Sequence, residues 1–211
     1  MIVNRQLQAV VQHAQLYRAA GTASPARLPI IRLLHALFHT HRFNTCQPSH
    51  ITPLIALYGG TLSQADQSLL SIFYLYEKQR KEPITSLLHN WSPSGATVVS
   101  HNILDVVIDL DANKVFKSCI NFPSRRDPSA VLDKNLDDIN LYDPLFLCLL
   151  ASQLLIEHKS LSTTEWVQVF RSNIFSIIIR VLTSRNEEFR KIALAILGGL
   201  LIRVQVRFYF V

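Results

Sequence analysis

The stretch DPLFLCLLASQLLIE, from Asp143 to Glu157, decides the fold class of this chain. Asp is a favoured residue at a helix N-cap, and proline is tolerated at the first helical position, so Asp143 and Pro144 predict a helix start. No glycine or second proline interrupts the stretch before Glu157. Its residues are nearly all apolar, which is typical of a helix that is buried on every side. The rest of the chain must therefore supply the elements that cover it.

The segments around this stretch also have helical patterns. Ser63 is a predicted N-cap, and Asp66 three residues later complements the positive end of the helix dipole. Glu187 and Glu188 start a last helix that continues through the apolar run 192–202. In the helix predicted over Ala26–His41, we expect a core stripe of Ile30, Leu33, Leu34, Leu37 and Phe38. Further short helices are predicted at 4–20, 48–58, 102–110, 112–120, 162–170 and 173–183.

Helices that alternate with short turns predict an all-α fold, and we favour an α-solenoid of HEAT- or armadillo-like helix pairs over a compact helical domain. We expect the chain to be a fragment of a longer array. The residues 204–211 alternate like a β-strand and are interpreted as an aberrant or truncated end. The expected divisions are a basic helical segment (1–45), a helical repeat region (46–121), a loop (122–141), the start of a C-terminal helical domain (142–203) and that end (204–211).

The composition supports a folded protein with a sizeable core. Hydrophobic residues make up 49% of the chain and charged residues only 17%, which is the opposite of a disordered composition. The three cysteines, Cys46, Cys119 and Cys148, are odd in number and widely spaced, which favours buried thiols over a disulfide framework. The most apolar run, 192–202, is too short to cross a bilayer. We therefore expect no membrane contact.

Positive charge is concentrated at the start of the chain, because the first acidic residue is Asp66. A second basic site, Arg125 and Arg126, follows Phe122-Pro123. Arginine suits both phosphate and carboxylate partners, so these residues predict contact with RNA or with an acidic protein. The alternatives are a solvated helix face for the first group and an internal partner, Asp127 or the Asp133–Asp138 cluster, for the second. The RNA-binding candidates are Arg5, Arg18, Arg27, Arg32, Arg42, Arg125 and Arg126.

A histidine-rich region is a candidate metal site. His35 and His39 are four residues apart on one predicted helix face, as in a metal-ligand pair. However, no glutamate follows His35 as in a zinc hydrolase, and no paired CxxC is present. We favour partly exposed histidines on a basic helix, which would also suit phosphate. The other members of the region are His41, Cys46 and His50.

No sequence signature of an enzyme is present: the chain has no P-loop, dinucleotide-binding glycine pattern, nucleophile elbow or kinase motif. We therefore expect a protein without catalytic residues, metal or cofactor.

Three stretches together resemble the nucleolar pre-ribosomal-associated protein 1 family, from the middle-to-late part of its long chains. The first is LYGGTLS (57–63), followed by Asp66, the pair 69–70 and LYE at 75–77. The second is INFP (120–123) with Arg125 and Arg126, and the third is LYDPLFL (141–147). The resemblance covers about Thr52–Leu201 and excludes the last eight residues.

This resemblance implies a very long nucleolar α-solenoid that acts in early assembly of the large ribosomal subunit. It implies association with pre-ribosomal RNA, small nucleolar RNAs, a DEAD-box helicase and other assembly factors, and it implies no catalysis. The expected function is a scaffold that holds RNA and assembly factors together. The alternative is a protein-binding solenoid adaptor that makes no RNA contact.

Overall fold

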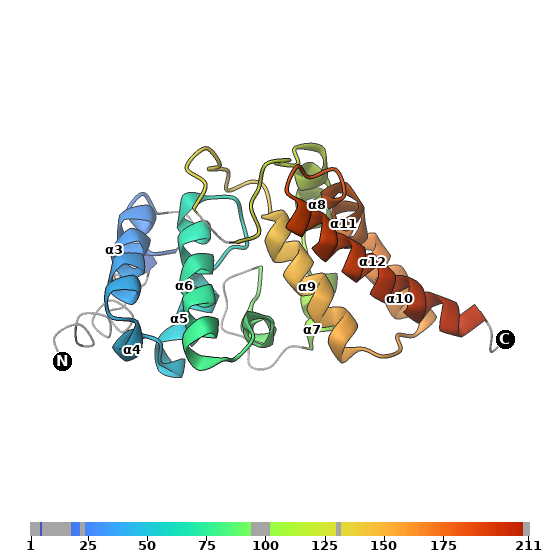
Figure 1. Cartoon of the computed structure of the whole chain (residues 1–211), viewed down its shortest axis with the longest axis horizontal. Coiled ribbons are helices and arrows are strands. Elements are labelled where there is room, and N and C mark those ends of the chain that lie inside the picture. The colour runs from blue at the N-terminus through green and yellow to red at the C-terminus, as the bar shows by residue number, and fades with distance from the viewer. Residues whose placement is uncertain (1–4, 6–17, 22–23, 94–101, 130–131, 209–211) are drawn as a thin grey trace. The chain divides into compact units, whose positions relative to one another are not determined.

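The computed structural model describes residues 5, 18–21, 24–93, 102–129 and 132–208. Within this part of the chain, helices are joined by turns and no strand is formed, so the predicted all-α class is confirmed. The solenoid arrangement is compatible with this content and stays a prediction. The chain divides into two compact units, which are coloured by residue number in Figure 1 and are described here separately.

Unit 1 comprises residues 1–100 and 130–139. Its longest helix, α6, packs against α3, and the buried side chains of Leu34, Phe38 and Phe73 lie in its core. Trp91 is also buried in this core, and its indole N–H donates to the Tyr58 carbonyl at 2.6 Å. The elements are α3 (Arg27–Thr40), α4 (Arg42–Thr45), α5 (Pro48–Leu57), α6 (Gln64–Arg80) and the 3₁₀-helix η1 (Ile84–Asn90).

Unit 2 comprises residues 101–129 and 140–211. Helix α9 is central to it and packs against α7, α11 and α12, as the all-apolar pattern predicts. Its side chains are buried around most of its circumference, although Ile156 is 66% exposed near its end. The elements are α7 (Ile103–Ile108), α8 (Ala112–Ile120), α9 (Pro144–Glu157), α10 (Thr163–Arg171), α11 (Ile174–Val181) and α12 (Glu187–Phe208).

The predicted helix starts are confirmed by hydrogen bonds of the capping side chains. The Ser63 hydroxyl accepts from the Asp66 amide at 3.3 Å, and the Asp143 carboxylate accepts from the Leu145 amide at 3.0 Å. Ser162 and Glu165 form a reciprocal capping box at the start of α10. These local signals are reliable because the cap satisfies amides that have no partner within the helix.

The core stripe of α3 differs from the predicted one. Ile31 is fully buried where Ile30 was expected, and Leu33 is 53% exposed. The reason is that Arg27, a residue that the apolar pattern did not count, turns inward to bond Asp66. Positions 27, 31, 34 and 38 of α3 are therefore the buried ones, and Leu34 and Phe38 are the two members of the predicted stripe among them.

The strand-like prediction for the end of the chain is wrong for its described part, because α12 continues to Phe208. Once a helix is formed, each added residue gains a backbone hydrogen bond, and nothing after Gly199 breaks this helix. The Arg203 guanidinium also holds the helix against the end of α9 by donating to the carbonyls of Leu155 and His158. Residues 209–211, and the first predicted helix apart from residues 5 and 18–20, lie outside the described residues.

Candidate nucleic-acid interface

Two of the candidate RNA-binding arginines are buried and engaged in ion pairs. Arg27 is 4% exposed and Arg126 only 1%. A buried charge must be paired, and both residues form an ion pair inside their own unit, although Arg27 Nε has no hydrogen-bond partner among the described residues. The structure therefore removes Arg27 and Arg126 from the candidate RNA contacts.

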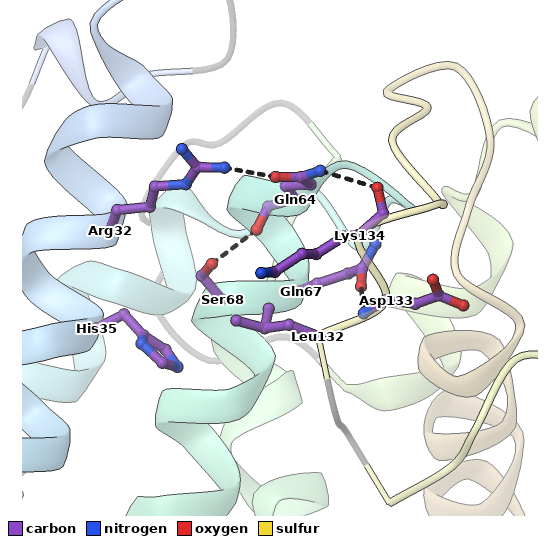
Figure 2. Close-up of a pocket in the computed structure, with 8 residues that line it drawn as sticks. All are labelled: Arg32, His35, Gln64, Gln67, Ser68, Leu132, Asp133 and Lys134. Atoms are coloured by element: carbon purple, nitrogen blue, oxygen red, sulfur yellow. Dashed lines mark hydrogen bonds between the residues drawn. The ribbon is translucent and has the colours of Figure 1, made fainter.

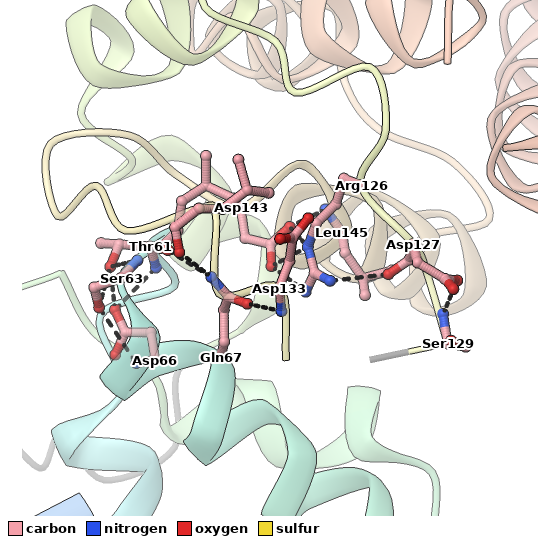
Figure 3. Close-up of polar contacts among 12 residues, drawn as sticks. Thr61, Ser63, Asp66, Gln67, Arg126, Asp127, Ser129, Asp133, Asp143 and Leu145 are labelled. Atoms are coloured by element: carbon pink, nitrogen blue, oxygen red, sulfur yellow. Dashed lines mark hydrogen bonds and ion pairs between the residues drawn. The ribbon is translucent and has the colours of Figure 1, made fainter. Parts of the chain in front are cut away.

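Arg27 binds Asp66, the acid that the sequence places in the first turn of α6. An Arg27 guanidinium nitrogen lies 2.6 Å from Asp66 Oδ1 and also donates to the Leu57 carbonyl at 2.9 Å. The same carboxylate accepts from the amides of Gly59 and Thr61, each at 3.0 Å, and from the Thr61 hydroxyl. Figure 3 shows Thr61 and Ser63 beside the Asp66 side chain. Asp66 thus fixes the turn between α5 and α6.

Glycine is required in this turn for two separate reasons. Gly60 has φ of 65°, a left-handed conformation that glycine adopts without strain. A Cβ at Gly59 would lie 2.9 Å from Asp66 Oδ2, too close for an ordinary contact. The Gly59-Gly60-Thr61 sequence is therefore a backbone cradle for a buried carboxylate.

Arg126 has the corresponding role in unit 2. It grips Asp143 with two nitrogens, Nε at 3.1 Å and a terminal nitrogen at 2.7 Å from Oδ2, and it donates to the Asp127 carbonyl at 2.9 Å (Figure 3). Asp143 simultaneously caps α9. The sequence offers Asp127 or the Asp133–Asp138 cluster as an internal partner for this arginine. In the structure the partner carboxylate is that of Asp143, and the carboxylate of Asp127 accepts from the Ser129 amide.

The other candidate arginines, Arg5, Arg18, Arg32, Arg42 and Arg125, are exposed. The Arg32 guanidinium donates to Gln64 Oε1 at 2.6 Å, and that of Arg42 lies over the Phe43 ring, 5.3 Å from its centroid. These five residues stay candidates for phosphate contact.

The histidine region is organised by hydrogen bonds between side chains. The rings of His35 and His39 lie 4.2 Å apart, and an Nε2 of each is 3.2 Å from the Ser71 hydroxyl. Burial, assisted by the charge of His39, lowers the pKa of His35 to about 4, so this ring is neutral near pH 7. His50 is buried and bonds the Thr45 carbonyl instead. In the described part of the chain, no three metal-ligating side chains come together.

A groove of about 490 Å³ lies in unit 1 between α3, α6 and the segment Leu132–Lys134. Figure 2 shows the Lys134 side chain extending across α6 toward the side from which Arg32 and His35 project. The segment is held in place by Gln67, whose side-chain oxygen accepts from the Asp133 amide at 2.9 Å. The full lining is Arg32, His35, Gln64, Gln67, Ser68, Leu132, Asp133 and Lys134.

Sequence reasoning missed Lys134 as part of a basic site. The signal was hidden, because Lys134 lies between Asp133 and Asp137 and its neighbourhood reads as acidic. In the folded chain these two carboxylates face backbone amides: Asp133 accepts from Asn135 at 2.9 Å, and Asp137 from Gln64 at 3.0 Å. Lys134 itself makes no ion pair or hydrogen bond through its ammonium group with any of the described residues.

Comparison with known proteins adds an external observation. The chain is similar to nucleolar pre-ribosomal-associated proteins. It is 27% identical to Nucleolar pre-ribosomal-associated protein 1 of Homo sapiens and 25% identical to that of Mus musculus, with 74% of this chain covered in each case. It spans 8% of the length of either relative. No protein-family model and no solved structure matches the chain.

The similarity to Nucleolar pre-ribosomal-associated protein 1 confirms the resemblance found in the three stretches. The structure gives those stretches an architectural meaning, because they contain Asp66 of the first buried ion pair and both members of the second. Gly59, Gly60 and Asp66 belong to the first, and Arg126 and Asp143 to the second. None of the described helices is long and apolar enough to cross a lipid bilayer.

Proposed function

We propose that this chain is a non-catalytic scaffold segment in nucleolar assembly of the large ribosomal subunit. The observation that carries the proposal is the similarity to two proteins named nucleolar and pre-ribosomal-associated, along 74% of the chain. The nucleolar location follows from those printed names. The helical content suits a scaffold, since stacked helices present extended surfaces to several partners.

The proposed partners are pre-ribosomal RNA, small nucleolar RNAs and ribosome assembly factors, including a DEAD-box helicase. Phosphate contact would fall to the exposed arginines, since an arginine fork binds phosphate oxygens while its stem stays on the protein surface. Of this set, only Arg32 lines the groove between α3 and α6, and Arg42 and Arg125 are two of the four that do not. Arg27 and Arg126 support the scaffold internally and do not reach the RNA.

In-cell crosslinking of the chain to RNA, followed by sequencing, tests this proposal. We expect crosslinks to pre-ribosomal RNA and enrichment of the chain in nucleolar pre-ribosomes. Glutamate in place of Arg42 and Arg125 should reduce the crosslinks and the salt dependence of RNA binding, because fewer counterions are then released. A chain that enters no pre-ribosome would contradict the scaffold role.

A second function, a protein-binding adaptor without RNA contact, is favoured by apolar side chains on the surface of unit 2. Phe116 and Ile120 on α8 are 54% and 61% exposed, and Phe170 on α10 is 50% exposed. Large exposed apolar groups are typical of surfaces that bind other proteins. Recovery of the chain in pre-ribosomes without any RNA crosslink would support this alternative.

A further inference from the structure

We infer that the groove between α3, α6 and the segment Leu132–Lys134 binds one phosphodiester of single-stranded RNA, with Arg32 and Lys134 as its two cationic contacts. This inference rests on the proposed function and assigns a site to it. The groove brings together cations from two segments that are far apart in the sequence. Phosphate oxygens are the groups that proteins most often bind through arginine and lysine.

Arg32 is held in position by an internal hydrogen bond that leaves its other donors available. One terminal nitrogen donates to Gln64 Oε1 at 2.6 Å, which orients the guanidinium over the first turn of α6. Gln64 is itself fixed, because its side-chain amide donates to the Lys134 carbonyl at 3.2 Å. The remaining Arg32 donors are available to a ligand, and Figure 2 shows the side chain projecting from α3 at the edge of the groove. A prearranged donor loses less side-chain entropy when it binds.

Lys134 is brought to the groove by the folding of its segment onto α6. Gln67 is buried and bonds this segment at two points, the Asp133 amide at 2.9 Å and the Leu136 carbonyl at 2.8 Å. Two carboxylates close to it in the sequence, Asp133 and Asp137, accept from backbone amides, and neither forms an ion pair with Lys134 among the described contacts. Among the described residues the ammonium group therefore has no ion-pair partner, and it is exposed, as a residue that binds an external anion must be.

The walls favour RNA over a protein partner. Leu132 is the one aliphatic hydrophobic residue in the lining, whereas a groove that receives an amphipathic helix needs an apolar surface. The half-buried His35 ring lies beside the cations with the His39 ring 4.2 Å from it, and aromatic rings of this kind stack on unpaired bases. A volume of about 490 Å³ is within the range of sites that bind small organic groups, so a phosphate and part of its nucleotide can enter.

The test uses the 211-residue chain and a fluorescent oligouridine, with affinity measured at several salt concentrations. We expect the double variant Arg32→Ala and Lys134→Ala to bind about ten-fold more weakly, as loss of two charge-assisted contacts implies. The slope of log K against log salt should fall by about 0.7, the value for one phosphate on a single strand. Both side chains are exposed, so the melting temperature should stay unchanged.

The matched control is Arg185→Ala with Lys78→Ala, which removes one exposed arginine and one exposed lysine outside the groove. We expect this control to bind RNA like the wild type. Equal losses in both double variants would show a diffuse charge effect and overturn the site, while the proposed RNA contact would stand. If the groove variant binds RNA like the wild type, the site is also overturned.

A wild-type chain that binds no oligouridine would overturn the RNA contact proposed for this segment together with the groove. Polyglutamate of the same length serves as a competitor, and competition equal to that of unlabelled RNA would assign the groove to an acidic protein partner instead.

Specific binding should also raise the pKa of His35, measured by NMR, because a phosphate beside the ring stabilises its protonated form. That rise should be absent in the groove variant.

Discussion

Neutralising Asp143 should destabilise unit 2 more than any change at an exposed ion pair. Its carboxylate has two roles, since it receives two nitrogens of Arg126 and also caps α9 at the Leu145 amide. Removing one partner of a buried pair leaves an uncompensated charge, which costs about 3–5 kcal/mol. Loss of an N-cap costs about 1 kcal/mol.

The two contributions can be separated by the choice of substituent. Asparagine is a good N-cap, so Asp143→Asn should lose only the ion pair, about 3 kcal/mol, while Asp143→Ala should lose roughly 1 kcal/mol more. Arg126→Met should cost about as much as Asp143→Asn. The double variant Arg126→Met with Asp143→Asn should be more stable than the sum of the single losses implies, by about 0.5–3 kcal/mol, because neither side retains a buried charge.

The assay is urea unfolding followed by tryptophan fluorescence in a Trp91→Phe background. The chain has two tryptophans, and this background leaves only Trp166, which reports on unit 2. The control is Glu188→Gln on α12. The Glu188 carboxylate lies 2.9 Å from the Lys191 ammonium, whose side chain is 58% exposed, and we expect no measurable loss of stability. Losses below about 1 kcal/mol for both Asp143→Asn and Arg126→Met would refute the interpretation of an obligatory buried pair.

Three more predictions concern unit 1. Asp66→Asn should destabilise it by about 3 kcal/mol, read from the fluorescence of Trp91 in a chain that lacks the other tryptophan. Gly60→Ala should cost about 1–2 kcal/mol in the same assay, because alanine is strained in the left-handed region, and an unchanged midpoint would contradict the φ of 65°. The pKa of His35 lies at about 4 when folded and at its ordinary 6.5 when unfolded, so the unfolded chain binds more protons between these values. Its stabilising effect is present above pH 6.5 and is lost as pH falls toward about 4, and His35→Phe should flatten the stability profile in that window.

The parts of the fold that the sequence predicted are those set by neighbouring residues. Ser63, Asp143 and Ser162 cap helices through amides two or three residues away, so their patterns are visible in the sequence itself. The alternation was misinterpreted over residues 204–208, which continue α12, because so short a window does not separate a strand from the continuation of a helix.

The parts that escaped prediction depend on long-range contacts. Arg27 pairs with Asp66, and the rest of α3, then α4 and α5, lie between them in the sequence. Nothing in the local sequence pattern distinguishes Arg27 from the exposed Arg32. Lys134 contributes to a basic groove only because Gln67 holds its segment against α6. Charge counted along the sequence therefore assigned buried and exposed arginines to one group and overlooked the lysine.

The similarity to the pre-ribosomal-associated proteins and the proposed RNA contact rest on different residues, which makes them separable. The stretches that carry the resemblance contain buried groups such as Asp66, Arg126 and Asp143, whose visible task is to hold the helices. The groove cations, Arg32 and Lys134, are exposed and lie outside those stretches. A variant of Asp66 should lose RNA binding at the groove only at temperatures where unit 1 unfolds, whereas the groove variant should lose it with the fold intact. If both variants lost binding with their melting temperatures unchanged, the division between architectural and RNA-contacting residues would be wrong.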